Sequence, residues 1–445
     1  MQGTPFADAL CYRRPAPRGH SGALARVLRR ALAGALALVL SLAAAVAYAS
    51  DAVPERRKDQ FPTSPAHLVV PLAYSYPGIG EGFFLMGNFS NVFDTTTDVL
   101  AMYVTGDAAG YILQVDEAPI IEKHLFFKYY YQDIQRAVIN QYDTRGMKGT
   151  SKYDYTLLDV SLALQNTAVL DLTFFDRRVD FSYVHTTTEY EVQAIRDHNG
   201  AIISALNEPF RGKDSNQSFG ATFDLTDDYL DPRKGVRFGL AYQNWPAERA
   251  QDPSYYVVDY KLLAYLPMFE NDTLVFNYYQ SDAHVTKPGT TDPAAIRQEL
   301  HLNCAAADSA CLQSEQHLVD VFTNYRNNGT ANPLGGKERL RSFPQGRFRG
   351  GHSAFAGAEY RWNFKQGVAP FDYLFWKDVR TGLQLAFFGE VGSVSETAAE
   401  LWNESRTSYG VGLRLVAASG AVYRADIANG REGAELTLFF YYPWE

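Results

Sequence analysis

The basic stretch 335–350 contains the residues best suited to ion-pair chemistry. It carries five Lys or Arg and four Gly in sixteen residues, and Phe343, Pro344 and Phe348 interrupt it. Gly and Pro at this frequency predict a loop rather than a helix or a strand. Guanidinium groups bind carboxylates through a planar fork that Lys cannot match. We therefore expect this loop to lie against acidic side chains.

Glu359 and Glu390 are the acidic partners that the sequence suggests. Each lies in a segment of alternating residues, on the face opposite the more apolar one. If these segments are neighbouring strands of a membrane barrel, both carboxylates point into the lumen. Two carboxylates so placed repel each other unless a cation lies between them. Arg341, Arg347 or Arg349 could supply that cation.

The other reactive residues form no catalytic pattern. Hydrolases need Ser, His and an acid in register, but no G-x-S-x-G occurs and none of the nine histidines stands in a recognisable motif. Gly78-x-Gly80-x-Gly82 has the wrong spacing for a nucleotide-binding loop and indicates a turn. The sequence shows no cluster of metal ligands. We therefore expect no enzyme, no cofactor and no metal.

Cys304 and Cys311 are predicted to form a disulfide. Six residues separate them in a polar loop, and cysteines of exported proteins usually pair. A metal site is the alternative, but His301 is the only further ligand nearby. The third cysteine, Cys11, lies in a segment that we expect to be removed.

Residues 1–49 are typical of a secretory signal peptide. Six arginines precede the apolar run 31–47, and a small-x-small cleavage pattern ends at Ala49. A membrane anchor is the alternative, but the run is only about 17 residues, short of the roughly 20 that a spanning helix needs. The polar segment 50–66 is then a periplasmic lead-in, which leaves no room for an independent domain before residue 67.

The chain without this leader is acidic and rich in aromatic residues. Removing six arginines and Asp8 from 41 basic and 50 acidic residues leaves 35 against 49. This balance argues against nucleic acid as a partner. Aromatic residues make up 14% of the chain, which suits the aromatic belts of a membrane barrel.

Residues 67–445 are predicted to form an all-β fold, one transmembrane antiparallel β-barrel. Alternating segments of about 9 to 15 residues suit tilted membrane strands, whereas soluble strands average about 5 to 6. A soluble sandwich, the alternative, shows the same alternation. The fifteen segments are 81–92, 97–106, 109–117, 123–136, 153–166, 169–184, 216–227, 234–245, 254–268, 272–283, 351–364, 380–394, 406–418, 421–429 and 433–443.

Bacterial single-chain barrels have an even number of strands, so we expect sixteen. The missing strand is expected around 67–75. The segments 185–215 and 284–350 are predicted to be long extracellular loops, with a short helical turn at 293–300. A loop as long as the second one is usually functional.

The loop sequence resembles that of a known family. Leu340-Arg341-Ser342-Phe343, followed by Gly346-Arg347-Phe348-Arg349, is similar to the loop-six Arg-Gly-aromatic signature of the BamA/TamA superfamily, the bacterial surface antigen proteins. The resemblance implies that Arg341 enters the barrel and that Glu359 and Glu390 are its partners. Phe343 and Arg347 are expected to brace the loop with it. Ser342 stands where the family usually has Gly.

Two further motifs resemble the same family. One is an acidic hairpin with Pro and Gly at its turn, formed by Asp224, Asp227, Asp231, Pro232 and Gly235. The other resembles the C-terminal β-signal that the assembly machinery reads, formed by Gly433, Leu436, Leu438 and Phe440.

The resemblance implies insertion or translocation of proteins, or of lipids, at the bacterial outer membrane. A weak seam between the first and last strands could then template client strands. The alternative is a channel or structural barrel without insertase activity, whose lumen carboxylates favour cations. Family members usually carry periplasmic POTRA domains, and we expect none here. The expected partners are outer-membrane lipid and either unfolded client proteins or a separate periplasmic protein, and we expect a monomer.

Overall fold

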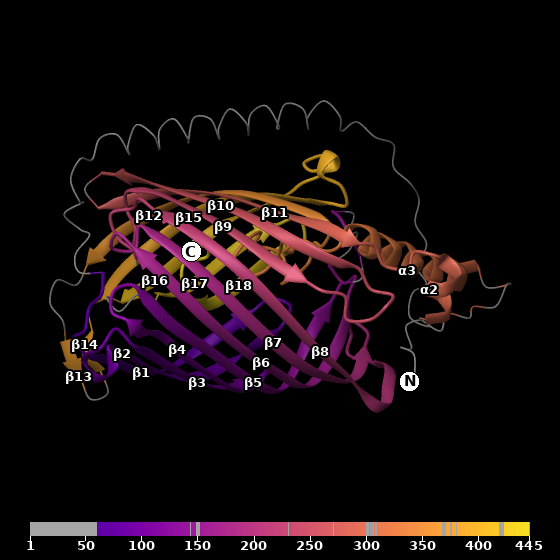
Figure 1. Cartoon of the computed structure of the whole chain (residues 1–445), viewed down its shortest axis with the longest axis horizontal. Helices are drawn as coiled ribbons and strands as arrows, with labels where there is room; N and C mark the ends of the chain where they lie inside the picture. Colours follow the sequence, from indigo (N-terminus) through magenta and orange to yellow (C-terminus); the bar gives the residue numbers. More distant parts are fainter. Residues whose placement is uncertain are drawn as a thin grey trace.

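Eighteen strands form one antiparallel sheet, and sixteen of them close into a barrel (Figure 1). The computed structural model describes residues 60–445 apart from 143, 148–151, 230, 270, 300–301, 303, 305–306, 308, 367–370, 374–375, 380, 418–421 and 445. The barrel strands are β1 (Ala66–Tyr76), β2 (Gly80–Ser90), β3 (Asp98–Gly106), β4 (Ala109–Ile121), β5 (Leu125–Gln141), β6 (Thr156–Phe174), β7 (Val179–Arg196), β8 (Ile202–Asp224), β9 (Gly235–Trp245), β10 (Ser254–Met268), β11 (Asp272–Lys287), β12 (His352–Gln366), β15 (Thr381–Ser395), β16 (Arg406–Ala417), β17 (Val422–Gly430) and β18 (Gly433–Phe440). Two short strands, β13 (Phe371–Tyr373) and β14 (Trp376–Val379), form a hairpin between β12 and β15.

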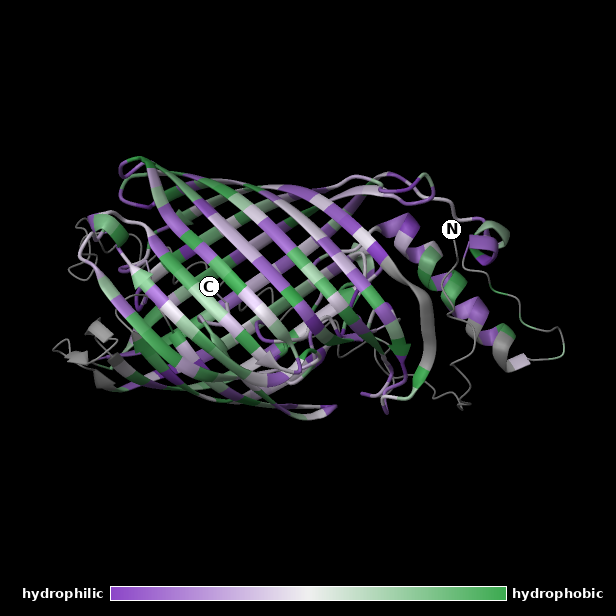
Figure 2. Cartoon of the chain, turned by 90° about the horizontal axis from the view of Figure 1, so that it is seen from below, coloured by the Kyte–Doolittle hydropathy of each residue, from purple (hydrophilic) through white to green (hydrophobic). Residues whose placement is uncertain are grey.

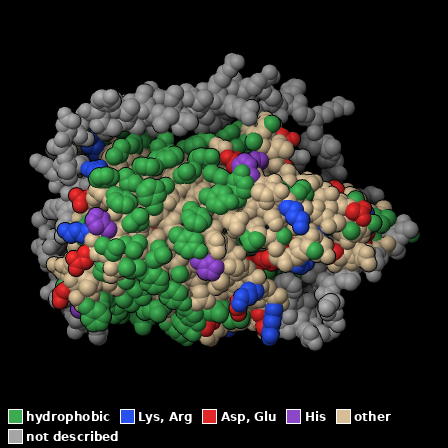
Figure 3. All heavy atoms as spheres, viewed as in Figure 1, with side chains coloured by type: hydrophobic (Ala, Val, Ile, Leu, Met, Phe, Trp, Pro, Cys, Tyr) green, Lys and Arg blue, Asp and Glu red, His purple; other side chains and the backbone are tan. Residues whose placement is uncertain are grey.

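The strand register sorts side chains onto an outer and an inner face. On β2 and β3, Phe83, Leu85 and Tyr103 point outward and are exposed, whereas Met86 and Val104 point inward and are buried. Figure 2 shows the alternation of apolar and polar residues along the strands. Figure 3 shows a broad apolar surface on the face of the barrel in view, with charged side chains mostly towards the ends of the barrel. A hydrocarbon environment requires such an outer face.

The predicted fold class is confirmed, and most strand boundaries agree within a few residues. The strand expected around 67–75 is β1. The prediction was wrong between β6 and β8. The segment 169–184, predicted as one strand, contains the end of β6, a turn and the start of β7. The segment 185–215, predicted as a loop, contains the rest of β7 and the first part of β8, which pair as a long hairpin. This hairpin carries polar residues on both faces, so the alternation that reveals a membrane strand is missing there.

The long connection between β11 and β12 contains two helices. α2 (Pro293–Glu299) lies where a helical turn was expected, and α3 (Ser309–Asn328) was not predicted. They pack on each other through Ile296, Leu318 and Val319. Both lie beyond one end of the barrel, which we call the loop end; the β13–β14 hairpin lies at the opposite end, the turn end (Figure 1). No helix in the described part of the chain is long and apolar enough to cross a membrane.

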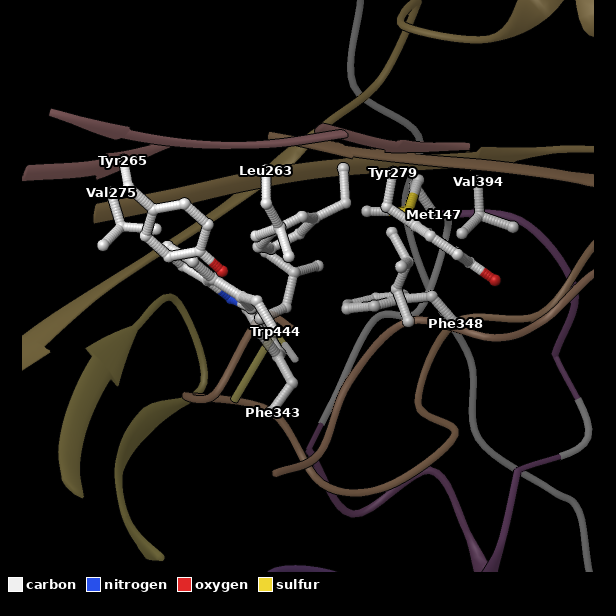
Figure 4. Packing of buried hydrophobic residues seen from close by; sticks show 12 residues of the cluster. Met147, Leu263, Tyr265, Val275, Tyr279, Phe343, Phe348, Val394 and Trp444 are labelled. Atoms are coloured by element: carbon white, nitrogen blue, oxygen red, sulfur yellow. The ribbon is translucent and has the colours of Figure 1, made fainter. Parts of the chain in front are cut away.

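The rest of this connection, residues 329–351, folds back into the lumen. Its apolar side chains join barrel residues in one buried cluster (Figure 4). The cluster comprises Met147, Leu263, Tyr265, Val275, Tyr279, Leu334, Leu340, Phe343, Phe348, Phe355, Val394 and Trp444. Apolar packing therefore occupies part of the space that a simple pore would leave to water.

The chain before β1 is anchored to the barrel by an aromatic side chain. Phe61 is buried with its ring 5.7 Å from that of Phe126, and the Arg177 guanidinium lies 4.7 Å from the Phe61 ring. The predicted signal peptide, 1–49, and most of the predicted lead-in, 50–66, lie outside the described residues.

Candidate functional site

A compact turn carries Arg341 into the lumen. Leu334 and Phe348 exchange backbone hydrogen bonds of 3.0 Å in both directions, which closes the base of the turn. Gly335 adopts a φ of +103°, a conformation that other residues rarely take. Leu340 also has a positive φ, +53°. Its left-handed backbone reverses the chain directly before Arg341.

Ser342 fits this turn although the related motif has Gly. The positive φ falls on Leu340, so Ser342 needs no left-handed backbone. Its backbone N donates to Ser408 Oγ at 3.0 Å. The Ser342 side chain lies against Gly430, where a Cβ would come within 2.2 Å of its Oγ. The absence of a side chain at Gly430 on β17 therefore leaves the space that the Ser342 side chain fills.

Arg341 is fully buried and contacts three carboxylates. Its Nε lies 2.8 Å from Glu390 Oε1, and its backbone N donates to Glu390 Oε2 at 2.9 Å. Its Nη1 lies 2.8 Å from Asp426 Oδ2, and its Nη2 lies 3.3 Å from Glu359 Oε2. The guanidinium carbon also lies 3.3 Å from the centre of the Phe388 ring. The structure thus places Arg341 between the two glutamates and adds a third acid from β17.

Three further arginines surround these carboxylates. Arg414 contacts both oxygens of Glu359 at 2.5 Å, and Arg361 Nε lies 2.9 Å from Glu359 Oε1. Arg424 Nη1 donates to Asp426. Four guanidinium groups therefore face three carboxylates, a formal excess of one positive charge. This lumen charge cluster comprises Arg341, Arg361, Arg414, Arg424, Glu359, Glu390 and Asp426.

Asp426, Arg414 and Arg424 were not named from the sequence, although a signal for them existed. Arg414 lies between Leu413 and Leu415 in the alternating segment of β16, and Asp426 and Arg424 share one face of β17. Applying the same alternation argument to these strands would have placed all three in the lumen.

Arg347 and Phe343 hold the same loop through other partners. Arg347 Nη2 lies 2.8 Å from Glu432 Oε1, and its Nε lies 3.0 Å from Glu432 Oε2, in the turn between β17 and β18. Arg341, and not Arg347, therefore lies between the two glutamates. Phe343 is buried with its ring 5.0 Å from that of Phe348. Glu432 could not be found by alternation because it lies in a turn.

The acidic hairpin forms the turn between β8 and β9. Asp224 is buried and pairs with Arg237 at 3.0 Å. Asp227 Oδ1 accepts hydrogen bonds of 2.8 and 2.9 Å from two backbone amides of the turn. Gly235 has a φ of +110°, and a Cβ there would lie 2.2 Å from a backbone oxygen. Asp231 and Pro232 complete this turn, with Pro232 buried.

The predicted β-signal lies on β18, which meets β1 at a short seam. In the part of the chain that the structure describes, these strands share one ladder position, Ser75 with Leu438. Ser75 Oγ also donates to Leu436 O at 3.0 Å. The ladder between β17 and β18, in contrast, runs along all of β18 from Gly433 to Phe440. The predicted strand 433–443 was therefore three residues too long.

Near the turn end, the edge of β1 has a different neighbour. His67 pairs with Lys377 and Leu68 with Trp376 of β14. The β13–β14 hairpin thus occupies part of the edge that β18 would cover in an evenly closed barrel.

Cys304 is disulfide-bonded. Its backbone N donates to Glu315 Oε1 at 2.7 Å, which ties this part of the loop to α3. The side chain of Cys311 lies outside the described part of the chain, so the pairing of Cys304 with Cys311 remains a prediction.

The fold and the site define a class of protein: a membrane-type barrel whose lumen holds a loop fixed by a buried arginine. A family model described as the Omp85 superfamily domain matches residues 119–431. The chain belongs to the Omp85 superfamily, and the resemblance seen in the loop motif is confirmed. The comparison with curated proteins gave no match.

The solved structures that are similar to the chain include three with low sequence identity. BamA from Haemophilus ducreyi lacking POTRA domains 1-3 shares 12% identity, with a TM-score of 0.44 over 85% of this chain and 69% of that one. CdiB from Escherichia coli shares 9%, with a TM-score of 0.46 over 84% and 62%. CdiB from Acinetobacter baumannii shares 10%, with a TM-score of 0.44 over 85% and 60%. The chain spans less than two thirds of either CdiB structure.

Proposed function

We propose that this barrel inserts or translocates proteins at the bacterial outer membrane, with its turn end towards the periplasm. The observation that carries the proposal is the seam. In the described residues, β18 forms no ladder pairs with residues 70–74 of β1. A strand edge without a ladder partner can take up another strand through its backbone groups. The seam therefore offers a place where a client strand could pair.

The lumen loop is suited to control this seam because it binds the strands on both sides. On the β1 side, Tyr76 OH donates to Gln345 Oε1 at 2.7 Å, and Gln345 N donates to Pro77 O at 2.9 Å. On the β17 side, Arg424 Nη2 donates to Lys337 O at 2.5 Å. The Lys337 ammonium lies 3.9 Å from the ring centre of Phe439 on β18 and 5.5 Å from that of Tyr76 on β1. The loop thus bridges a seam that has few ladder bonds of its own.

A channel without insertase activity is the competing reading. It is less well supported because the loop and its apolar cluster take up lumen space. The arginines of the lumen charge cluster also offset its carboxylates, which weakens the case for a cation-preferring pore.

Locking the seam tests the proposal. A Ser75→Cys/Leu438→Cys variant, with Cys304 and Cys311 replaced by Ser, is oxidised and placed in phospholipid vesicles. An unfolded eight-stranded outer-membrane barrel is added, and its folded fraction is followed by gel mobility. We expect the locked seam to slow client folding at least about tenfold, a barrier change of about 1.4 kcal/mol, and reduction to restore it.

The matched control places the same cysteine pair between β17 and β18, as Ile427→Cys/Leu436→Cys, which are ladder partners. Oxidising this control should leave client folding unchanged. A parent barrel that never accelerates client folding, but conducts ions steadily with the seam locked, would instead establish the channel.

A further inference from the structure

We propose that Tyr442–Trp444 forms an internal latch that holds β18 at the seam and must leave its site before the seam can open. A role for the latch in controlling client insertion rests on the proposed function, whereas its effect on closure of the seam does not. The latch enters the lumen directly after β18. Tyr441 has a φ of +61°, and its N donates to Val422 O at 2.7 Å. This left-handed residue turns the chain inward, so the segment leaves the path of the strand.

The end of β18 already packs against the inside of the barrel. The ring of Phe440 lies 4.8 Å from that of Phe84, whose side chain belongs to the inner face of β2. The contact reaches past β1, the strand next to β18 in the sheet. The end of β18 is thereby held on the lumen side of the seam.

Tyr442 connects β18 to distant strands at the turn end. Its hydroxyl donates to Asp231 Oδ1 at 3.0 Å, in the acidic hairpin between β8 and β9. The hydroxyl also accepts a 3.4 Å hydrogen bond from Gln384 Nε2 on β15. The Arg361 guanidinium of β12 lies 3.8 Å from the centre of the Tyr442 ring. One side chain therefore joins the end of β18 to three other parts of the barrel wall.

Trp444 connects the same segment to the lumen charge cluster. It is 1% exposed, and its ring lies 6.0 Å from that of Phe355. The Arg341 guanidinium lies 5.5 Å from the Trp444 ring. Space for the indole is provided by Gly357, where a Cβ would come within 2.6 Å of Trp444 Cζ2. Figure 4 shows Trp444 inside the apolar cluster that also contains Phe343.

Chain geometry links the latch to the seam. Tyr442 follows Phe440 by two residues, and an extended chain spans at most about 3.6 Å per residue. A displacement of the end of β18 by more than about 7 Å therefore pulls Tyr442 from Asp231 unless other parts move with it. Because Trp444 touches Arg341, movement of the loop and movement of the latch are also coupled. Tyr442 and Trp444 are thus positioning residues for the seam.

The test measures seam closure without any client. Ser75→Cys/Leu438→Cys, again with Cys304 and Cys311 replaced by Ser, is cross-linked with a short bismaleimide, and the rate is followed by gel mobility. We expect Trp444→Ala to slow cross-linking at least about tenfold, a shift of about 1.4 kcal/mol, and Trp444→Phe to restore much of the rate. Tyr442→Phe removes only the hydroxyl group and should slow cross-linking by a smaller factor. This variant still tests the latch if Trp444→Ala does not fold.

The control variant is Trp362→Ala, which removes the same side chain from the outer face of β12, where Trp362 is 46% exposed. Its cross-linking rate should equal that of the parent. Equal rates in Tyr442→Phe, Trp444→Ala and the parent would overturn the latch. If the latch variants cross-link like the parent but the locked seam still slows client folding, the latch is overturned and the proposed function stands. If the latch variants cross-link more slowly but locking the seam has no effect on client folding, the latch stands and the proposed function fails.

Discussion

Arg341 Nη1 lies 2.8 Å from Asp426 Oδ2, which joins the tip of the lumen loop directly to β17, the strand beside the last one. The same guanidinium contacts Glu359 on β12 and Glu390 on β15. One loop residue therefore ties together three strands and lies beside the latch residue Trp444. Removing it should affect both the stability of the barrel and the state of the seam.

Arg341→Ala is expected to destabilise the folded barrel by about 3–5 kcal/mol, the usual cost of leaving a buried charge without its partner. Glu390 is the residue most affected, because its described cation contacts come from Arg341. The measurement is the urea midpoint of the barrel in vesicles. Arg211→Ala is the control: it breaks an exposed pair with Glu191 and should change stability by at most about 1 kcal/mol.

A second substitution separates the charge effect from lost packing. If the loss comes from an unpaired buried carboxylate, Arg341→Ala/Glu390→Gln should be more stable than Arg341→Ala alone. A double variant as unstable as the single one would mean that packing of the Arg341 side chain dominates. An Arg341→Ala barrel that unfolds like the parent would rule out the bracing role.

Alternation predicted the inner faces of the strands well because one face of each strand meets lipid. It placed Glu359 and Glu390 in the lumen, and both are buried there. It could not predict Glu432 as the partner of Arg347, because a turn has no alternating faces. Nor could it predict the inward path of Tyr442: the alternation continues past Phe440, but the chain turns at Tyr441.

The elements that were not predicted from the sequence, the end of the β7–β8 hairpin and α3, lie outside the apolar outer surface of the barrel. In the part of the β7–β8 hairpin nearest the loop end, Thr187 pairs with Ser215 on one face and Thr188 pairs with Asp214 on the other, so both faces are polar there. The helix α3 is polar over most of its length and packs on α2 through few apolar residues. Without lipid on one side, neither element needs a regular apolar stripe.

Gly235→Ala is expected to destabilise the turn between β8 and β9 by about 1–3 kcal/mol, because a left-handed backbone strains a residue with a Cβ. The Cβ would also lie 2.2 Å from the backbone oxygen of Leu225. Thermal unfolding followed by gel mobility measures the effect. Gly239→Ala in the same strand is the matched control, because its Cβ would meet only Lys261 Cβ at 3.7 Å. Similar losses for both variants would contradict the role given to the turn.

The loop between β9 and β10, residues 246–253, is expected to loosen as the pH rises. A hydrogen bond with Asp214 and partial burial raise the pKa of Glu248 to about 7, from an ordinary value of 4.5. An acid with a raised folded pKa adds stability that is fully present below its ordinary pKa and is lost as the pH rises through 7. Above pH 7 the Glu248 carboxyl group loses its proton, and with it the hydrogen bond that the proton makes with Asp214.

Hydrogen exchange of residues 246–253 at pH 5.5 and pH 8, corrected for intrinsic rates, measures this change. Protection should fall between the two values in the parent chain. Glu248→Gln should remove the dependence, since an amide can keep a hydrogen bond to Asp214 without titrating. Protection that is the same at both pH values in the parent chain would show that the carboxyl pair has no effect on the loop.

The disulfide of Cys304 is expected to join it to Cys311, and this pairing can be tested.

 Six residues separate the two cysteines, and closing so short a loop is expected to add about 2–3 kcal/mol of local stability in the chain-entropy model. We expect the intact mass of exported protein to stay unchanged when an alkylating reagent is added without reduction. After reduction, the same reagent should add two alkyl groups. Two free thiols before reduction would reject the pairing. Replacing both cysteines by Ser should lower hydrogen-exchange protection in α3 and leave the barrel strands unchanged, because the loop lies beyond the barrel end.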